Sequence, residues 1–258
     1  MIYITGDTHG DFKRFSSKNL KKNLPEVTEK DYIIVCGDLG LCWAKDKEFE
    51  YNCEFFSQKP FTLLWVQGNH DNYDMLEEYP IEIWNGGKTR HIVKDKVILL
   101  ERGQVFNIEG KTFFTFGGAS SHDIQGGILD RSDIDYNEQR RRAIKRDLPY
   151  RVKHYSWWEQ ELPTQEEMNE GIKNLEAVDF TVDYVISHCN SSKAQQELAS
   201  VLKRSGDSYS TDVLTDYFDM LEKDLSFKRW YAGHYHVEED LESGHSILYK
   251  SIVPLVEV

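Results

Sequence analysis

Short apolar runs alternate along this chain with segments in which apolar residues recur at helical spacing. Runs rich in Val, Ile, Leu and Tyr lie at Ile2–Ile4, Tyr32–Cys36, Leu63–Gln67 and Tyr184–Ile186. Continuous runs of this kind predict buried strands of a mainly parallel or mixed sheet. Each run ends in a Gly-Asp, Gly-Asn or Ser-His step, so we expect polar side chains in loops at the carboxyl ends of the strands, where open α/β sheets place their sites.

Helical spacing or capping signals mark five further segments. The predicted helices span Asp11–Leu24, Lys47–Gln58 and Thr211–Leu221, and two more begin at capping boxes formed by Thr164 with Glu167 and by Ser192 with Gln195. After residue 236 the pattern changes to alternation, which predicts strands at 246–250 and 252–258 after the turn at 242–244. We expect this antiparallel terminal segment to form, with 112–116, a second sheet packed on the first.

The chain has 258 residues, of which 40% are hydrophobic, and this length and composition predict a single domain, residues 1–258. The stretch 130–158 is the least periodic part and is polar, with many arginines and aromatic residues. We interpret it as part of an irregular excursion at about 122–162 that lies near the site, rather than as a linker.

The formal net charge of -13 argues against sequence-independent binding of long nucleic acid, which needs clustered Lys and Arg. Small anionic substrates remain possible, because bound dications reverse the local charge of a carboxylate-rich site. No apolar run reaches the ~18–20 residues of a membrane span, and a strand at the start of the sequence leaves no room for a signal peptide. Four cysteines without C-x-x-C pairing are expected to be reduced, so we expect a cytoplasmic protein.

Five short blocks carry the candidate chemistry. They are Gly6-Asp7-Thr8-His9-Gly10-Asp11, Gly37-Asp38-Leu39-Gly40, Gly68-Asn69-His70-Asp71, Ser187-His188-Cys189-Asn190 and Gly233-His234-Tyr235-His236. Any one of them alone is more often a turn or a hydrogen-bonded core residue. Five in order supply the oxygen and imidazole ligands that suit borderline divalent metals, and two such ions ~3.5–4 Å apart can clamp both the attacking and the leaving oxygen of a phosphate ester.

The five blocks resemble the D-x-H, G-D, G-N-H-[DE], H and G-H-x-H pattern of the calcineurin-like metallophosphoesterase superfamily, over residues 6–236. The resemblance implies an α/β (α+β) fold, a four-layer sandwich of two packed mixed sheets flanked by helices. It implies that one ion is held by Asp7, His9 and His236, that the other is held by Asn69, His188 and His234, and that Asp38 bridges them.

A solvent molecule that bridges two dications would lose a proton near neutral pH, and this hydroxide is the expected nucleophile. By resemblance His70 is not a ligand and acts as general acid or as a hydrogen-bond donor to transition-state charge, with Asp71 expected to orient it. Carboxylate, amide and imidazole ligands with open positions favour manganese, and iron, zinc, nickel or cobalt would also fit.

The substrate is expected to be a small phosphate ester, and a nucleotide-like phosphodiester is favoured. The Gly-Asp-x-x-Asp-Arg-Gly block of phosphoprotein phosphatases is absent, since Leu39 and Gly40 follow Asp38. The segments 116–121 with Asp123 and 157–163 resemble small metallophosphoesterases of Gram-positive bacteria and their phages, some of which cleave phosphodiesters. The candidate substrate contacts are His122, Arg131 and Trp157, the last of which could stack a base.

Alternative interpretations stay open. Trp157 and Trp158 could simply pack the excursion onto the body, and the basic run 140–146 could be a solvated helix face rather than a docking patch for a second phosphate. The enzyme could be a phosphomonoesterase, including a phosphoprotein phosphatase, or the fold could serve as a scaffold that has no activity. The sequence does not predict the oligomeric state.

Overall fold

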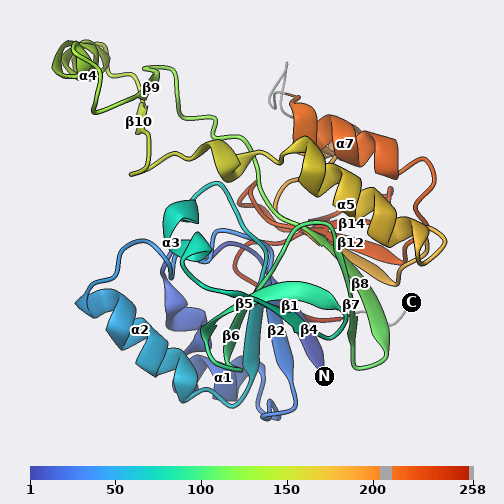
Figure 1. Ribbon diagram of the computed structural model, residues 1–258. Coiled ribbons are helices and arrows are strands. Elements are labelled where there is room, and N and C mark those ends of the chain that lie inside the picture. Colours follow the sequence, from blue (N-terminus) through green and yellow to red (C-terminus); the bar gives the residue numbers. More distant parts are fainter. Residues whose placement is uncertain (204–210, 256–258) are drawn as a thin grey trace.

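The computed structural model describes residues 1–203 and 211–255, and two sheets form its centre (Figure 1). The first sheet has the order β15-β1-β2-β3-β6-β5-β4. Its strands are β1 (Ile2–Thr5), β2 (Tyr32–Val35), β3 (Thr62–Trp65), β4 (Ile81–Trp84), β5 (Gly87–Val93), β6 (Val97–Leu100) and β15 (Ile252–Pro254). Strands β1, β2, β3 and β6 are parallel, whereas β15, β5 and β4 each run antiparallel to a neighbour.

The second sheet has the order β13-β14-β12-β11-β8-β7. Its strands are β7 (Gln104–Ile108), β8 (Lys111–Phe116), β11 (Tyr184–Ser187), β12 (Arg229–Ala232), β13 (Glu239–Asp240) and β14 (His245–Ile247). The four central strands, β8, β11, β12 and β14, are parallel to one another. Both sheets are therefore mixed, with parallel centres, as the sequence predicted.

Helices cover the outer face of each sheet. These are α1 (Ser17–Asn23), α2 (Lys47–Ser57), α3 (Tyr73–Glu77), α5 (Gln165–Glu176), α6 (Ser192–Val201) and α7 (Val213–Leu221). Phe15 of the short 3-10 helix η1 (Phe12–Phe15) and Phe56 of α2 pack on the first sheet, whereas Leu175 of α5 and Phe218 of α7 pack on the second. A third apolar cluster, which includes Ile34 and Ile186, lies between the sheets. This arrangement confirms the predicted four-layer sandwich.

Two helix boundaries differ from the predictions. The segment 11–24 is not one helix but η1 followed by α1, because Ser16 is extended (ψ 148°) and its side chain caps the second helix at the Asn19 amide. Helix α6 is capped one residue earlier than predicted, by Ser191, whose side chain accepts from the Ala194 amide. The capping box of Thr164 with Glu167 is present as predicted.

The terminal strands were predicted wrongly as an antiparallel addition to the second sheet. Strand β14 covers only His245–Ile247 and runs parallel to β12, while β15 crosses to the first sheet and pairs antiparallel with β1. The physical reason is that β1 would otherwise be an exposed edge with unpaired backbone groups. The end of the predicted strand, residues 256–258, lies outside the described residues.

The excursion at 122–162 contains regular elements where an irregular segment was predicted. They are β9 (Ile128–Leu129), α4 (Tyr136–Lys145), β10 (Arg151–Val152) and the 3-10 helix η2 (Glu159–Glu161). Strands β9 and β10 pair in parallel as a two-stranded sheet. Figure 1 shows α4, β9 and β10 projecting from the body above α3. The basic run lies mostly on α4, with its arginines exposed, which agrees with a solvated helix face.

No helix of the residues described here is long and apolar enough to cross a bilayer.

Candidate metal centre

The blocks with candidate ligands follow five parallel strands. Asp7, Asp38 and Asn69 come after β1, β2 and β3 of the first sheet. His188 follows β11 of the second sheet, and His234 and His236 follow β12. Because the carboxyl ends of parallel strands lie at one edge of a sheet, the polar side chains of both sheets meet where these two edges come together.

Asp7, His9 and His236 form one group whose ligand atoms all lie within 4.8 Å of one another. The Nε2 atoms of His9 and His236 are 2.9 Å apart. Oδ2 of Asp7 lies 3.1 Å from Nε2 of His236 and 3.6 Å from Nε2 of His9. These are the three residues that the resemblance assigns to one ion.

His188 is the centre of a second group. Its Nε2 lies 3.3 Å from Oδ2 of Asp38 and 3.2 Å from Oδ1 of Asn69. Its Nδ1 lies 2.7 Å from the carbonyl oxygen of Cys36. Donation to this carbonyl places the proton on Nδ1 and leaves Nε2 free to bind a metal. The His234 ring stands 5.0 Å from that of His188, between centroids.

Asp38 lies between the two groups. Its Oδ2 is 3.3 Å from Nε2 of His188, on the side of the second group, and 3.8 Å from Nδ1 of His9, on the side of the first. Asp7 also approaches both groups, because Asp7, Asp38 and His188 have ligand atoms within 4.8 Å of one another. The structure thus brings all seven proposed ligands together around a central pair of carboxylates.

The buried charges of this cluster fit divalent cations. Burial raises the pKa of Asp38, but the neighbouring His188 outweighs it and holds the pKa at about 2. Burial lowers the pKa of His188, but the carboxylates of Asp38 and Asp7 outweigh it and raise the pKa, and a cation bound at Nε2 would take the place of that proton. Oδ2 of Asp7 is buried and faces the ring nitrogens of His236 and His9, and no described residue meets it with hydrogen-bond geometry. An oxygen in this state, beside several imidazole nitrogens, is the donor set that borderline divalent metals prefer.

The glycine that precedes several proposed ligands is required by close packing. A Cβ atom on Gly37 would lie 2.0 Å from Nδ1 of His188, and one on Gly68 would lie 2.0 Å from Oδ1 of Asp38. A Cβ atom on Gly233 would lie 2.1 Å from Oδ1 of Asp7. The Gly-Asp, Gly-Asn and Gly-His steps of the sequence therefore let each loop backbone approach the side chains of another loop.

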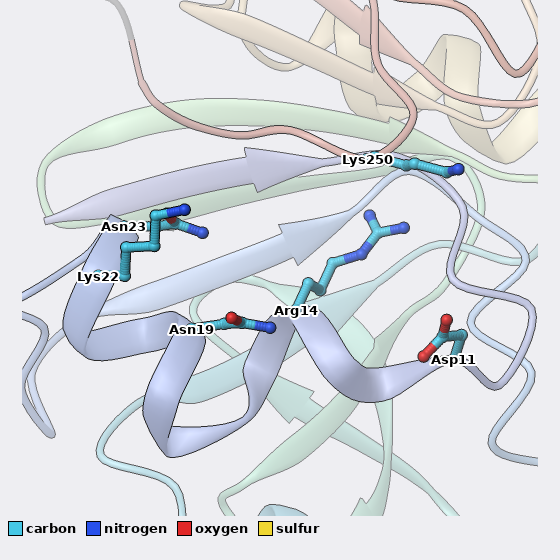
Figure 2. Close-up of a pocket in the computed structure, with 6 residues that line it drawn as sticks. All are labelled: Asp11, Arg14, Asn19, Lys22, Asn23 and Lys250. Atoms are coloured by element: carbon cyan, nitrogen blue, oxygen red, sulfur yellow. The ribbon is translucent and has the colours of Figure 1, made fainter.

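Arg14 of η1 holds the loop after β1 through the backbone carbonyl oxygens of that loop. Its guanidinium donates to the carbonyl oxygens of Gly6 (3.1 Å), Asp7 (2.6 Å) and Tyr249 (2.6 Å). The Tyr249 ring stacks on His236, with centroids 4.6 Å apart. Arg14 therefore links the loop that contains Asp7 to the segment whose Tyr249 packs on His236. Arg14 also lines a pocket of about 260 Å³, together with Asp11, Asn19, Lys22, Asn23 and Lys250. Figure 2 shows these side chains.

The family follows from comparison with known sequences. The family model of the calcineurin-like phosphoesterases matches residues 1–238. The chain belongs to this family. This phosphoesterase is a metal-dependent hydrolase of phosphoric esters, and the recognition made from the five sequence blocks is confirmed.

Two solved structures are distantly similar to this phosphoesterase. The phosphopantetheinyl hydrolase of Mycobacterium tuberculosis is 13% identical, with coverage of 96% of this chain and 87% of that chain and a TM-score of 0.41. A protein of unknown function from Aquifex aeolicus is 19% identical, with coverage of 57% and 74% and a TM-score of 0.25. A comparison with curated proteins gave no significant match.

His70 lies beside the first ligand group of the phosphoesterase. Its backbone N–H donates to Oδ1 of Asp38 at 2.7 Å, and its ring meets the His9 ring edge-on at 5.1 Å. Burial, assisted by the positive charge of Arg151, lowers the pKa of His70 to about 4 although Asp38 opposes the shift. The imidazole is therefore neutral at pH 7.

Asp71, which was expected to orient His70, contacts a different group. Its Oδ2 accepts a hydrogen bond from the backbone N–H of Gly68 at 2.9 Å, and its Oδ1 has no hydrogen-bond partner among the described residues. Burial and the nearby Asp38 charge raise the pKa of Asp71 to about 7. Asp71 thus holds the loop in place, and any effect on His70 passes through that loop.

The side chain that does contact the His70 ring is Arg151, to which the sequence analysis gave no role. Nη2 of Arg151 lies 3.0 Å from Nε2 of His70. A lone arginine after Leu148-Pro149-Tyr150 carries no motif, so the sequence offered no signal for this contact. It depends on how the excursion folds back over the site.

A second contact chain that sequence reasoning missed supports Asn69. Nδ2 of Asn69 donates to Oγ of Ser121 at 3.4 Å, and the Ser121 backbone N–H donates to Oε2 of Glu161 at 3.2 Å. Glu161 is 1% exposed, and burial raises its pKa to about 8. With its Nδ2 held by Ser121, the amide of Asn69 presents Oδ1 to His188. Ser121 and Glu161 lie in segments noted in the sequence, but nothing there distinguished them from loop residues.

The three candidate substrate contacts are placed differently. The exposed His122 ring stands 5.8 Å from the His234 ring, at the centre itself. Arg131 lies over the Tyr155 ring at 4.4 Å, out on the excursion. Trp157 is half-buried and lines a cavity of about 320 Å³ with other excursion residues. Its neighbour Trp158 is buried and donates to Asp74 of α3 at 2.8 Å, so Trp158 packs the excursion on the body.

Proposed function

We propose that this phosphoesterase hydrolyses small, nucleotide-like phosphodiesters at a centre of two divalent ions, with manganese preferred. The observation that carries the proposal is the position of Asp38 between two ligand groups, with oxygen-to-nitrogen distances of 3.3 and 3.8 Å to His188 and His9. A carboxylate in this position can hold two cations close together.

In this proposal Asp7, His9 and His236 hold one ion, Asn69, His188 and His234 hold the other, and Asp38 contacts both. The ions would supply positive charge to the phosphoryl oxygens and lower the pKa of bound water, so that the nucleophile forms at neutral pH. Cys36 and Ser121 orient the ligands His188 and Asn69 through the hydrogen bonds described above.

His70 acts as a neutral hydrogen-bond donor to charge that develops on the phosphoryl group. Its low pKa of about 4 disfavours the alternative, a protonated imidazole that gives its proton to the leaving oxygen at pH 7. Asp71 supports this position by holding the Gly68 amide of the same loop.

Two features favour a diester. The Gly-Asp block lacks the Asp-Arg-Gly continuation of the phosphoprotein phosphatases. In the proposal, Trp157 offers an aromatic face to a second substituent of the phosphate, such as a nucleoside, from the cavity of about 320 Å³ that excursion residues line. His122 stands beside His234 and Arg131 lies on Tyr155, out on the excursion, and both remain proposed substrate contacts. A phosphomonoesterase is the second candidate.

The proposal is tested by the hydrolysis of bis-para-nitrophenyl phosphate, para-nitrophenyl phosphate and 2′,3′-cyclic AMP. Metal-stripped protein would be assayed with and without manganese, beside Asp38→Ala and His70→Ala. We expect manganese-dependent diester cleavage that falls about 10²- to 10³-fold in His70→Ala and to background in Asp38→Ala. Faster turnover of the monoester would replace the diester assignment. No turnover at full metal occupancy would favour the scaffold alternative.

We also propose that the enzyme acts in the cytoplasm. The four cysteines are free, and three of them are buried. This agrees with a reducing compartment, where thiols do not need to be paired.

A further inference from the structure

The excursion brings one charged side chain into the centre. Arg151 begins β10, whose parallel pairing with β9 sets its position, and its side chain is 7% exposed. Lys and Arg are rarely buried to this extent unless their donors have partners. The identity of those partners shows what Arg151 can do.

One edge of the guanidinium is held by the excursion itself. Nε donates to Oδ1 of Asp123 at 2.8 Å, and Nη1 donates to the carbonyl oxygen of Ser156 at 2.8 Å. These two bonds join the start of the excursion to the turn after β10. They fix the plane and direction of the guanidinium, and Nη1 also lies 3.4 Å from Nδ1 of His70.

The other edge faces the centre. The only partner of Nη2 among the described residues is the His70 ring, at 3.0 Å from Nε2 and 3.4 Å from Nδ1. An imidazole has at most one acceptor lone pair, whatever its protonation state, so it cannot satisfy both N–H groups of Nη2. At least one N–H group of this buried guanidinium therefore has no acceptor among the described residues, next to the residue proposed to contact the phosphoryl group.

The position of this donor relative to the metal ligands follows from the ring contacts. The His70 ring meets the His9 ring at 5.1 Å, and His9 in turn meets His236. Arg151 therefore contacts the ring that lies next to the first ligand group. An oxygen anion bound at the edge of His70 that Arg151 contacts would meet Nη2 as well.

We infer that Arg151 binds the phosphoryl group of the substrate, an inference that rests on the proposed function. Its free edge donates to a non-bridging phosphate oxygen, and Asp123 and Ser156 hold the guanidinium in place for this contact. Planar N–H donors match the oxygens of a phosphate better than a point charge does. In this inference the excursion supplies a substrate contact to the catalytic site.

Binding of inorganic phosphate to the manganese-loaded protein, measured by calorimetry, tests the inference without turnover. We expect Arg151→Ala to bind phosphate at least 10-fold more weakly, and Arg151→Lys to lie between it and the wild type. Arg141→Ala, an exposed arginine of α4, is the matched control and should bind as the wild type does. Manganese affinity should be equal in all four proteins, because Arg151 contacts no proposed ligand.

Asp123→Asn separates phosphate binding from mere anchoring of the excursion, because the amide oxygen of asparagine can still accept the hydrogen bond from Nε while the ion pair is lost. If Arg151 served only to anchor the excursion through this ion pair, Asp123→Asn would weaken phosphate binding as much as Arg151→Ala does, and this would overturn the inference. Since the guanidinium stays in position, we expect Asp123→Asn to stay within about 3-fold of the wild type. Phosphate binding that is absent from the wild type, or unchanged in Arg151→Ala, would also overturn it.

Activity on bis-para-nitrophenyl phosphate distinguishes this failure from that of the proposed function. A wild type that cleaves the diester, with Arg151→Ala equally active and equally able to bind phosphate, keeps the proposed function and rejects the inference. A wild type that binds phosphate through Arg151 but cleaves no ester keeps the inference and rejects the proposed function.

Discussion

Glu161 is a buried carboxyl group that supports Asn69 through Ser121. Burial raises its pKa to about 8, compared with 4.5 for a free glutamate side chain. At neutral pH it is therefore mostly protonated in the folded protein and ionised in the unfolded chain. Its presence makes the free energy of unfolding depend on pH.

We predict that Glu161 lowers stability as pH rises. Below pH 4.5 both states are protonated, and between pH 4.5 and 8 only the unfolded state loses the proton, so stability falls by at most about 1.4 kcal/mol per pH unit. The free energy of unfolding of the metal-free protein can be measured in urea at pH 5 and at pH 8. From pH 5 to pH 8, the stability of Glu161→Gln relative to the wild type should increase by on the order of 2 kcal/mol. Glu159→Gln, an exposed neighbour, should show no such gain. Parallel pH profiles for Glu161→Gln and the wild type would contradict the prediction.

At the level of single residues, the sequence predicted the proposed ligands but not the residues that hold the site in position. Asp7 or His234 can be recognised because each stands at a fixed offset from a glycine after a strand. Arg151 and Glu161 have no such offset, since each acts across 40 residues or more of sequence, on His70 and Ser121. Contacts of this kind arise from tertiary packing, which local patterns do not contain.

Among the described helices of ten or more residues, α4 is the least supported, since α2 also has one buried residue but has an N-cap with side-chain hydrogen bonds. Helix α4 has 10 residues, its N-cap Asp135 makes no side-chain hydrogen bond, and Ala143 is its only buried residue. By contrast, α5 has 12 residues, a capping box and three buried residues. Isolated helices shorter than ~12–15 residues are marginal in water, so α4 depends on the few contacts it has.

We predict that α4 opens before the other long helices. Its backbone amides should exchange with deuterium on the order of 100-fold faster than those of α5, as measured by mass spectrometry of peptic fragments, because local opening there exposes little apolar surface. The α5 peptide of the same sample is the internal control. Equal protection of the two helices would contradict the prediction, and it would mean that another molecule covers α4 in solution.

The helix ends show which boundaries can be predicted from neighbouring residues alone. The start of α5 was predictable because Thr164 and Glu167 cap it within one turn. The break at Ser16 was not, because the apolar spacing of Phe12, Phe15 and Leu20 continues across it. The backbone N–H of this serine caps the end of η1, and its side chain caps the start of α1. The position of the break depends on the packing of Phe15 and Leu20 on the first sheet.

For the whole molecule, the centre is a junction between the two sheets. The first sheet supplies Asp7, Asp38 and Asn69, and the second supplies His188, His234 and His236. Bound cations would therefore link the two halves of the sandwich and neutralise its buried carboxylates. Ions that bind only the folded state stabilise it by mass action.

We predict that chelation of the metals lowers the melting temperature. Each site filled at 100 times its dissociation constant contributes about 2.7 kcal/mol, and for a chain of this size the two together correspond to roughly 10–20 °C. Differential scanning fluorimetry with and without EDTA measures this shift. Asp38→Asn, which keeps the side-chain shape but loses the bridging charge, should respond much less. An unchanged wild-type melting temperature after verified metal removal would contradict the prediction.

The order of the strands lay beyond what the sequence could predict. Runs such as Ile2–Ile4 and Tyr184–Ile186 look alike, yet they belong to different sheets. The alternating terminal pattern and the family resemblance both indicated two sheets, whereas the position of β15 depends on which edge is left open once the other strands have paired. That the chain forms a single domain remains a prediction.

The pairing of β15 with β1 has a consequence for the synthesis of the protein. Strand β1 is made some 250 residues before β15, its neighbour on one side. The proposed ligands are spread in the same way, from Asp7 to His236. A nascent chain can therefore offer a cation only partial sets of the proposed ligands until His236 has been made, so the complete centre forms late in the synthesis of this segment.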